Sequence, residues 1–144
     1  MILLDVGVWL AAIWARHLHH RPAKRWFDAQ SDSLLLCRVT QMSLLRLMSN
    51  AAIMGDDVLT RGEAWWVIDR LRADDRVLWA DDPPQLEAAF RAISARHDHS
   101  HKLWTDDYLA AFAQAGGSSL ATLDSKLGER YPSIRVEQVI RPAM

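Results

Sequence analysis

Three aspartates occupy positions from which their carboxylates could share one metal ion. Asp5 directly follows the short apolar run Ile2–Leu4, and Asp124 directly follows the run Ser119–Leu123. Both runs have the composition of buried strands, and the carboxyl ends of parallel strands open onto the crevice where such sheets bind ligands. Asp106 adds a third carboxylate from the first turn of a predicted helix. We therefore expect the three side chains to converge.

The chemistry of such a cluster is metal-assisted hydrolysis. Neighbouring carboxylates repel one another unless a cation lies between them, and hard oxygen ligands favour Mg²⁺ or Mn²⁺. An ion held in this way activates a water molecule and neutralises charge on a phosphoryl group, so it suits phosphodiester cleavage. The structural alternative is that Asp5 only forms a turn or caps a helix, and that Asp106 only favours a helix dipole. Spacing alone leaves both interpretations open.

Strand-like and helix-like runs alternate along the chain. Strands are predicted at residues 2–4, 33–37, 77–79, 119–123 and 135–139, and helices at 8–18, 22–29, 40–50, 60–72, 85–96 and 106–114. Thr40, Thr60 and Thr105 are the expected N-caps, with Glu63 completing a capping box at Thr60. This order predicts an α/β sandwich, with a parallel sheet covered by helices on both faces, in one domain that spans residues 1–144.

The composition narrows the class of protein. The chain has 144 residues, a net charge of −1 and one cysteine, Cys37, which excludes an internal disulfide and a cysteine-rich metal site. It has neither a signal-peptide pattern nor an apolar run of about 18 residues. These features predict a cytoplasmic protein without membrane contact.

Basic residues gather in two segments despite the neutral balance. The segment 16–25 reads R-H-L-H-H-R-P-A-K-R, and a second segment, 96–102, contains three histidines. A basic stripe can steer a polyanion, although such runs are more often solvated surface. A histidine metal site is the alternative, but neither cluster has an acid or cysteine partner at a ligand spacing, so we expect surface loops.

Four ordered segments resemble the motifs of PIN-domain ribonucleases, and most closely the VapC-type toxins of bacterial toxin–antitoxin pairs. They are L-L-D-V-G-V-W-L (3–10), C-R-V-T-Q-M-S-L-L-R (37–46), W-T-D-D-Y-L-A-A-F-A (104–113) and L-A-T-L-D (120–124). The resemblance implies a PIN-like three-layer α/β/α sandwich with a central parallel sheet of 4–5 strands. It also implies a homodimer, Mg²⁺ or Mn²⁺ at the acidic site, cleavage of RNA such as tRNA, and inhibition by a bound antitoxin.

The resemblance assigns roles to individual residues. Asp5, Asp106 and Asp124 match the first, third and last acidic positions of the family and would be both catalytic residues and metal ligands. Thr105 and Thr122 resemble hydroxyls that orient the carboxylates, a role that metal sites generally need.

Three positions depart from the family pattern. PIN domains commonly have a glutamate where this chain has Gln41, although an ungapped alignment puts Ser43 there. An amide can hydrogen-bond a water near the metal but adds no charge, so it weakens metal binding. Gly7 stands where an asparagine or serine is usual. Asp107 replaces a small residue and is either a further ligand or, as we expect, a solvent-facing acid.

The same departures keep other functions open. A non-catalytic PIN module that binds RNA or a partner protein is favoured by the loss of the glutamate, whereas the three retained aspartates favour an enzyme. A haloacid-dehalogenase-like phosphatase needs a second acid two residues after its first aspartate, and Gly7 occupies that place.

Partner-binding surfaces are predicted from charge and aromatic content. Arg46, or the basic residues Arg16, Arg21, Lys24 and Arg25, would position the RNA strand. The helices around residues 40–70 carry methionine and tryptophan side chains that would receive the antitoxin. Trp65 and Trp66 are adjacent on one helix and cannot both face one core, so one of them is expected at a protein contact.

Overall fold

Five short parallel strands form the central sheet of the computed structural model, which describes residues 1–140. The strands are β1 (Ile2–Leu4), β2 (Leu34–Leu36), β3 (Val77–Trp79), β4 (Ser119–Thr122) and β5 (Val136–Gln138). Their order across the sheet is β3-β2-β1-β4-β5, and every neighbouring pair is parallel. The predicted parallel sheet is confirmed.

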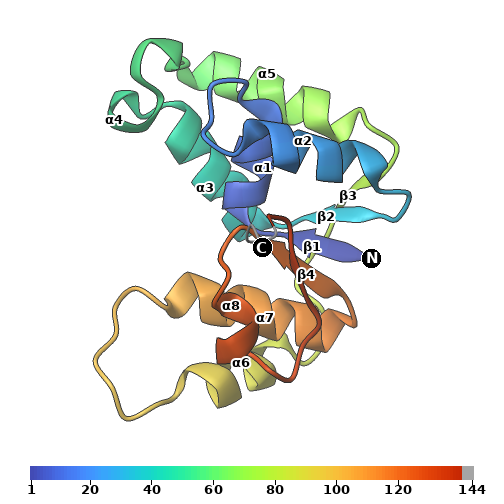
Figure 1. The fold of residues 1–144 in the computed structure, drawn as a ribbon. Coiled ribbons are helices and arrows are strands. Elements are labelled where there is room, and N and C mark those ends of the chain that lie inside the picture. Colours follow the sequence, from blue (N-terminus) through green and yellow to red (C-terminus); the bar gives the residue numbers. More distant parts are fainter. Residues whose placement is uncertain (141–144) are drawn as a thin grey trace.

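Helices cover both faces of the sheet, which confirms the predicted three-layer α/β/α arrangement (Figure 1). One face carries α1 (Val6–Ile13), α2 (His20–Ala29), α3 (Arg38–Met48), α4 (Ala51–Met54), the 3-10 turn η1 (Gly55–Asp57) and α5 (Arg61–Arg72). The other carries α6 (Leu86–Ser94), α7 (Trp104–Gly116) and α8 (Leu127–Arg130). Within residues 1–140, no helix is long and apolar enough to cross a membrane.

Side chains of the strands alternate between two apolar clusters. Ile2 and Leu4 contribute to the cluster under α1–α5, which includes the fully buried Trp9. Leu3 contributes to the cluster under α6–α8, together with Leu109 of α7. The strands β1, β2 and β4 are buried on both faces and carry no charged side chain, and Asp5 and Asp124 lie just beyond the ends of β1 and β4.

Two helix starts follow directly from local hydrogen bonds. The capping box at α5 is confirmed, because the Glu63 N–H donates to Thr60 Oγ1 at 3.1 Å and the Thr60 N–H donates to Glu63 Oε1 at 2.9 Å. Helix α1 spans residues 6–13, so the predicted span of 8–18 is wrong at both ends. It begins early because Asp5 Oδ1 accepts from the Val6 N–H at 2.7 Å and caps the first turn.

Two predicted N-caps are wrong. Helix α3 begins at Arg38, with Cys37 as its N-cap, so Thr40 lies in the first turn with its hydroxyl 3.4 Å from Cys37 Sγ. Helix α7 begins at Trp104, one residue before Thr105. The helices α4 and α8 were not predicted, because segments of four residues carry too little periodic signal.

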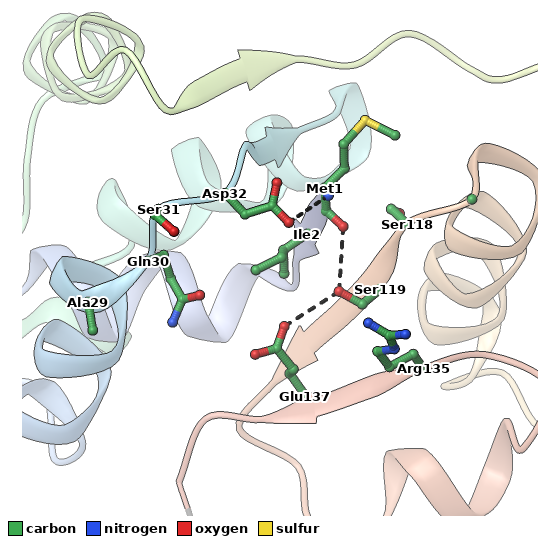
Figure 2. A pocket seen from close by; sticks show the side chains of 11 residues that line it. Met1, Ile2, Ala29, Gln30, Ser31, Asp32, Ser118, Ser119, Arg135 and Glu137 are labelled. Carbon is green, nitrogen blue, oxygen red and sulfur yellow. Dashed lines mark hydrogen bonds and ion pairs between the residues drawn. The ribbon is translucent and has the colours of Figure 1, made fainter.

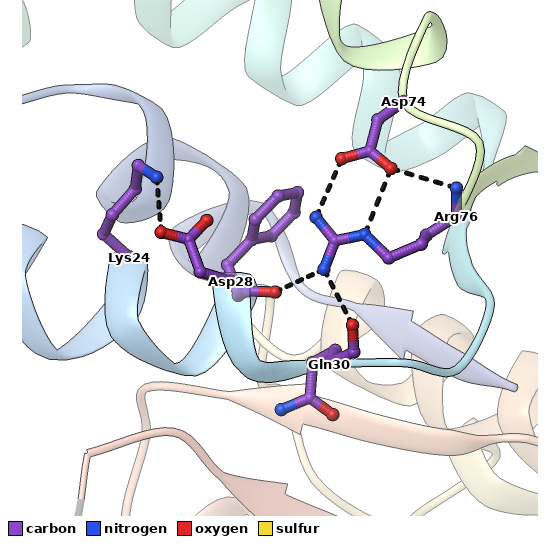
Figure 3. Close-up of polar contacts among 6 residues, drawn as sticks. Lys24, Asp28, Gln30, Asp74 and Arg76 are labelled. Atoms are coloured by element: carbon purple, nitrogen blue, oxygen red, sulfur yellow. Dashed lines mark hydrogen bonds and ion pairs between the residues drawn. The ribbon is translucent and has the colours of Figure 1, made fainter.

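One arginine fastens the end of α2 to the turn before β3 (Figure 3). Arg76 pairs with Asp74 at 2.8 Å, and its Nη1 donates to the carbonyl oxygens of Phe27 at 2.6 Å and Gln30 at 2.9 Å. The Phe27 carbonyl also accepts from the Gln30 N–H at 3.2 Å, so the guanidinium gives it a second donor and supplies a donor to the Gln30 carbonyl just past the helix end. This contact fixes the approach of the chain to β2.

Candidate active site

The strand order places the ends of β1 and β4 side by side. From the central β1 the chain builds β2 and β3 on one side and β4 and β5 on the other, which makes the β1/β4 boundary the topological switch point. Asp5 follows β1, and its backbone N–H donates to the Ala121 carbonyl in β4 at 3.0 Å. Asp124 lies two residues beyond the end of β4. Both aspartates therefore lie at the same edge of the sheet.

The guanidinium of Arg130 joins two of the three predicted site carboxylates, those of Asp106 and Asp124. Arg130 Nη2 donates to Asp106 Oδ2 at 3.0 Å and to Asp124 Oδ2 at 3.0 Å. Asp106 comes from the first turn of α7, and Arg130 ends α8. The start of α7, the segment after β4 and the end of α8 thus meet at one point.

The three carboxylates differ in how readily they ionise. Burial raises the pKa of Asp5 to about 6, with a further increase from the charges of Asp106 and Asp124, against the lowering effect of the Val6 N–H. Burial also raises the pKa of Asp106, opposed by Arg130. The pKa of Asp124 is lowered, first by the backbone N–H of Lys126 and then by Arg130. A desolvated carboxylate beside other charges is typical of functional sites.

The donors of this cluster fit a divalent cation in type and charge. Asp106 and Asp124 already hold one cation between them, the guanidinium of Arg130. The negative charges of both residues also raise the pKa of Asp5. Throughout residues 1–140, however, no three acidic, histidine or cysteine side chains are arranged around one metal position. The cluster therefore has suitable ligands without a preformed cage.

Asp107 is not the solvent-facing acid that we expected. Its exposed fraction is 7%, and it accepts a hydrogen bond from the hydroxyl of Tyr131, which is itself buried. Burial and this bond raise the pKa of the Tyr131 phenol. The tertiary contact with the segment after α8 accounts for the difference, since a first-turn aspartate without it would face water.

The two predicted supporting threonines have different surroundings. Thr122 is buried, and its Oγ1 accepts from the backbone N–H of Asp124 at 3.0 Å, so it fixes the backbone of Asp124 rather than its carboxylate. Thr105 is exposed, and no side-chain hydrogen bond joins it to a carboxylate among the described residues.

Gln41 and Gly7 are two of the positions that depart from the family pattern. Gln41 is buried, and its Oε1 accepts from Arg38 Nη1 at 2.7 Å, so its amide oxygen is bound by Arg38. A Cβ at Gly7 would lie 3.6 Å from Leu123 Cδ1, which is ordinary van der Waals contact. Steric crowding therefore does not explain the glycine.

The predicted RNA-contacting arginines lie outside the carboxylate cluster. Arg46 is exposed in the last turn of α3 and lines a groove of about 260 Å³ between α3 and α5. The other residues that were predicted to contact RNA are also exposed: Arg16, Arg21, Lys24 and Arg25. Two of them face acids, because Arg16 lies 3.5 Å from Asp57 and Lys24 lies 2.6 Å from Asp28.

A second polar pocket lies at the opposite edge of the sheet (Figure 2). It has a volume of about 560 Å³ and is lined at the amino ends of β1, β4 and β5 by residues that include Asp32, Arg135 and Glu137. Asp32 is already bound by the amino group of Met1 at 2.8 Å. This pocket is separated from Asp5 and Asp124 by the length of the strands.

The sequence interpretation missed Arg130 and Tyr131. Both contact the aspartates of α7 across 24 residues of chain. The sequence offered one signal for them, which is that they follow Asp124 closely in the chain. No helix or strand was predicted in this segment, and Arg130 was given no role.

Comparison with known proteins identifies related chains. The family model described as PIN domain matches residues 2–131. Ribonuclease VapC41 of Mycobacterium tuberculosis is 40% identical over 131 residues, which cover 87% of this chain and 90% of the relative. Ribonuclease VapC29 of the same organism is 29% identical over 136 residues, which cover 94% of each chain.

Solved structures give the same fold at lower identity. VapBC2 from Rickettsia felis, bound to a DNA fragment from its promoter, has a TM-score of 0.68 at 14% identity and covers 95% of this chain and 98% of its own. FitAcB from Neisseria gonorrhoeae has a TM-score of 0.64 at 18% identity, with coverage of 94% and 96%. The acidic edge of the sheet, the matched family model and the 40% identical relative lead to one conclusion: this chain belongs to the PIN domain family and is of the VapC type.

Proposed function

We propose that this chain is a Mg²⁺- or Mn²⁺-dependent endoribonuclease and the toxin of a toxin–antitoxin pair. The observation that carries the proposal is the pairing of Asp106 and Asp124 through Arg130, at the edge of the sheet where Asp5 follows β1. The names of the VapC relatives support the choice of RNA as substrate.

Two of the three carboxylate residues are held in place by hydrogen bonds that involve the backbone. Asp5 is tied to β4 through its N–H and caps α1 through its side chain. Asp124 is held by Thr122 Oγ1 and accepts from the Lys126 N–H at 2.9 Å. Together with Asp106 they would hold the ion, which supplies charge neutralisation at the scissile phosphate and activation of water when bound. The residues contribute fixed ligand positions on a rigid sheet edge.

The experiment is cleavage of total bacterial RNA by the purified chain, freed of any antitoxin. We expect discrete fragments with Mg²⁺ or Mn²⁺ and intact RNA with EDTA. The variant Asp124→Asn should lose cleavage by about 100-fold or more, as expected when a metal ligand is neutralised. The matched control is Asp75→Asn, which removes the same charge at an exposed position after α5 and should cleave normally.

A non-catalytic module is the second candidate, because Gln41 is bound by Arg38 and Gly7 has no side chain. RNA that stays intact with both ions, while the chain still binds it, would favour this candidate over the nuclease. Formation of a homodimer and a cytoplasmic location stay predictions from the resemblance and the composition.

The antitoxin would bind in the groove between α3 and α5. The groove is lined by Met42, Leu45, Arg46, Ser49, Arg61, Ala64 and Trp65. Met42 and Trp65 are about half exposed, at 53% and 48%, although both are large and apolar. Exposed apolar side chains with two arginines at the rim suit an amphipathic segment that carries acidic residues.

Trp65→Ala should weaken antitoxin binding by at least about tenfold, because exposed tryptophans that become buried dominate interface energies. The matched control is Trp66→Ala, since Trp66 lines a different hollow with Phe27 and Arg70. Isothermal titration with the product of the adjoining reading frame measures both variants. Unchanged binding by Trp65→Ala together with loss by Trp66→Ala would move the antitoxin to the α2/α5 side.

A further inference from the structure

The guanidinium of Arg130 occupies the space between two of the three predicted metal ligands. Its Nη2 donates to Oδ2 of both Asp106 and Asp124 at 3.0 Å, so one nitrogen serves two carboxylates. The Arg130 side chain is 31% exposed, while its Nε is buried and has no hydrogen-bond partner among the described residues. The guanidinium therefore neutralises charge on both carboxylates but donates to them through one nitrogen only. An arginine often bonds a carboxylate through two nitrogens.

The backbone next to Arg130 is fixed independently of this contact. Tyr131 is buried and donates to Asp107, the residue that follows Asp106 on α7. The Tyr131 N–H also donates to the Leu127 carbonyl at 3.1 Å. Movement of the Arg130 side chain therefore does not require α8 to leave its place, since the neighbouring residue anchors it to α7.

A metal ion and the guanidinium of Arg130 compete for these oxygens. A Mg²⁺ or Mn²⁺ ion binds carboxylate oxygens directly, and a charge of +2 within a few ångströms repels a guanidinium strongly in a partly desolvated site. Both Oδ2 atoms are bound by Arg130 in the present arrangement. Within residues 1–140, the carboxylates do not surround one metal position.

We propose that Arg130 is the resident counter-ion of the acidic site and that metal binding is an exchange, in which Arg130 releases Asp106 and Asp124. The inference rests on the proposed function only for the presence of a metal at these residues. Arg130 is here a positioning residue that keeps two ligands together and balances their charge until the ion arrives. Removing the Arg130 guanidinium frees the carboxylate oxygens for a metal ion. In the metal-free protein, the carboxylates of Asp106 and Asp124 then repel each other.

The first test is a titration of metal-free protein with Mn²⁺, followed by electron paramagnetic resonance of the free ion. Arg130→Gln should bind Mn²⁺ about tenfold more tightly than wild type, because the competing charge is gone. The matched control is Arg135→Gln, which removes an equal charge beside the pocket at the opposite edge of the sheet and should change affinity less than about twofold. Affinity that is equal or weaker in Arg130→Gln overturns the exchange.

The second test uses the wild-type chain and does not depend on how the variant folds. In nitrogen-15 spectra of the arginine side chains, the Arg130 Nε–H signal should shift during a Mg²⁺ titration with the midpoint of metal binding. A signal that stays in place at saturating Mg²⁺ overturns the proposal. If RNA stays intact while this exchange is observed, the nuclease proposal fails and the exchange stands. If no metal binds, the exchange fails as well.

Discussion

Asp5→Asn is expected to abolish RNA cleavage and also to stabilise the metal-free protein at neutral pH. The pKa of Asp5 is raised from 3.8 to about 6 by burial beside Asp106 and Asp124, so the folded state resists its ionisation. The variant loses a metal ligand, and we expect cleavage to fall by about 100-fold or more. Asparagine retains an oxygen that can accept from the Val6 N–H, so the cap of α1 is preserved.

The gain in stability should depend on pH in a defined direction. Because the folded pKa lies above the unfolded one, ionised Asp5 lowers the free energy of unfolding. The loss is absent well below pH 4, grows as the pH rises towards 6 and is complete above it. A shift of about two units corresponds to at most about 3 kcal/mol. Urea denaturation in EDTA should therefore give a larger gain for Asp5→Asn at pH 7.5 than at pH 4.5.

Asp75→Asn serves as the control, because it removes a carboxylate that is exposed to solvent. It should alter neither cleavage nor the pH dependence of stability. Cleavage by Asp5→Asn within tenfold of wild type would remove Asp5 from the catalytic set. An equal gain at both pH values would instead show that the charge of Asp5 is not the cause.

Tyr131→Phe should destabilise the protein by about 1–3 kcal/mol, the cost of leaving a buried hydrogen-bond acceptor without its donor. Asp107 is 7% exposed and Tyr131 is 4% exposed, and the phenol hydroxyl is the side-chain donor to Asp107 among the described residues. Removing both polar groups in Asp107→Ala/Tyr131→Phe should recover part of the loss. A double-mutant cycle by urea denaturation should then give a coupling energy of about 1–3 kcal/mol.

The chain contains a matched substitution for this test. Tyr108→Phe also removes a phenol hydroxyl that donates to an aspartate, but its partner Asp82 is exposed to solvent. Water replaces the lost donor there, so we expect a change below about 1 kcal/mol. Similar effects of the two substitutions would mean that Asp107 is solvated and that its bond to Tyr131 does not anchor α8 to α7.

Local sequence signals identified the elements that carry the site. Apolar runs predicted β1 to β4, and the Thr60–Glu63 pair predicted the start of α5, because these features depend on neighbouring residues. The motifs around Asp5, Asp106 and Asp124 were recognisable for the same reason. The starts of α3 and α7 were predicted less well, since threonines inside the first turn resemble caps when only residue type is considered.

What the sequence by itself determined is therefore the alternation of strands and helices, and its motifs singled out three aspartates as the candidate site. The tertiary structure decided which strands are neighbours, and so placed Asp5 and Asp124 at the same switch point. It also buried Asp107 against Tyr131 and inserted Arg130 between Asp106 and Asp124. The reason is physical: these contacts join residues far apart in the chain, and packing and charge balance in the folded state select them, whereas propensity and periodicity describe only local choices.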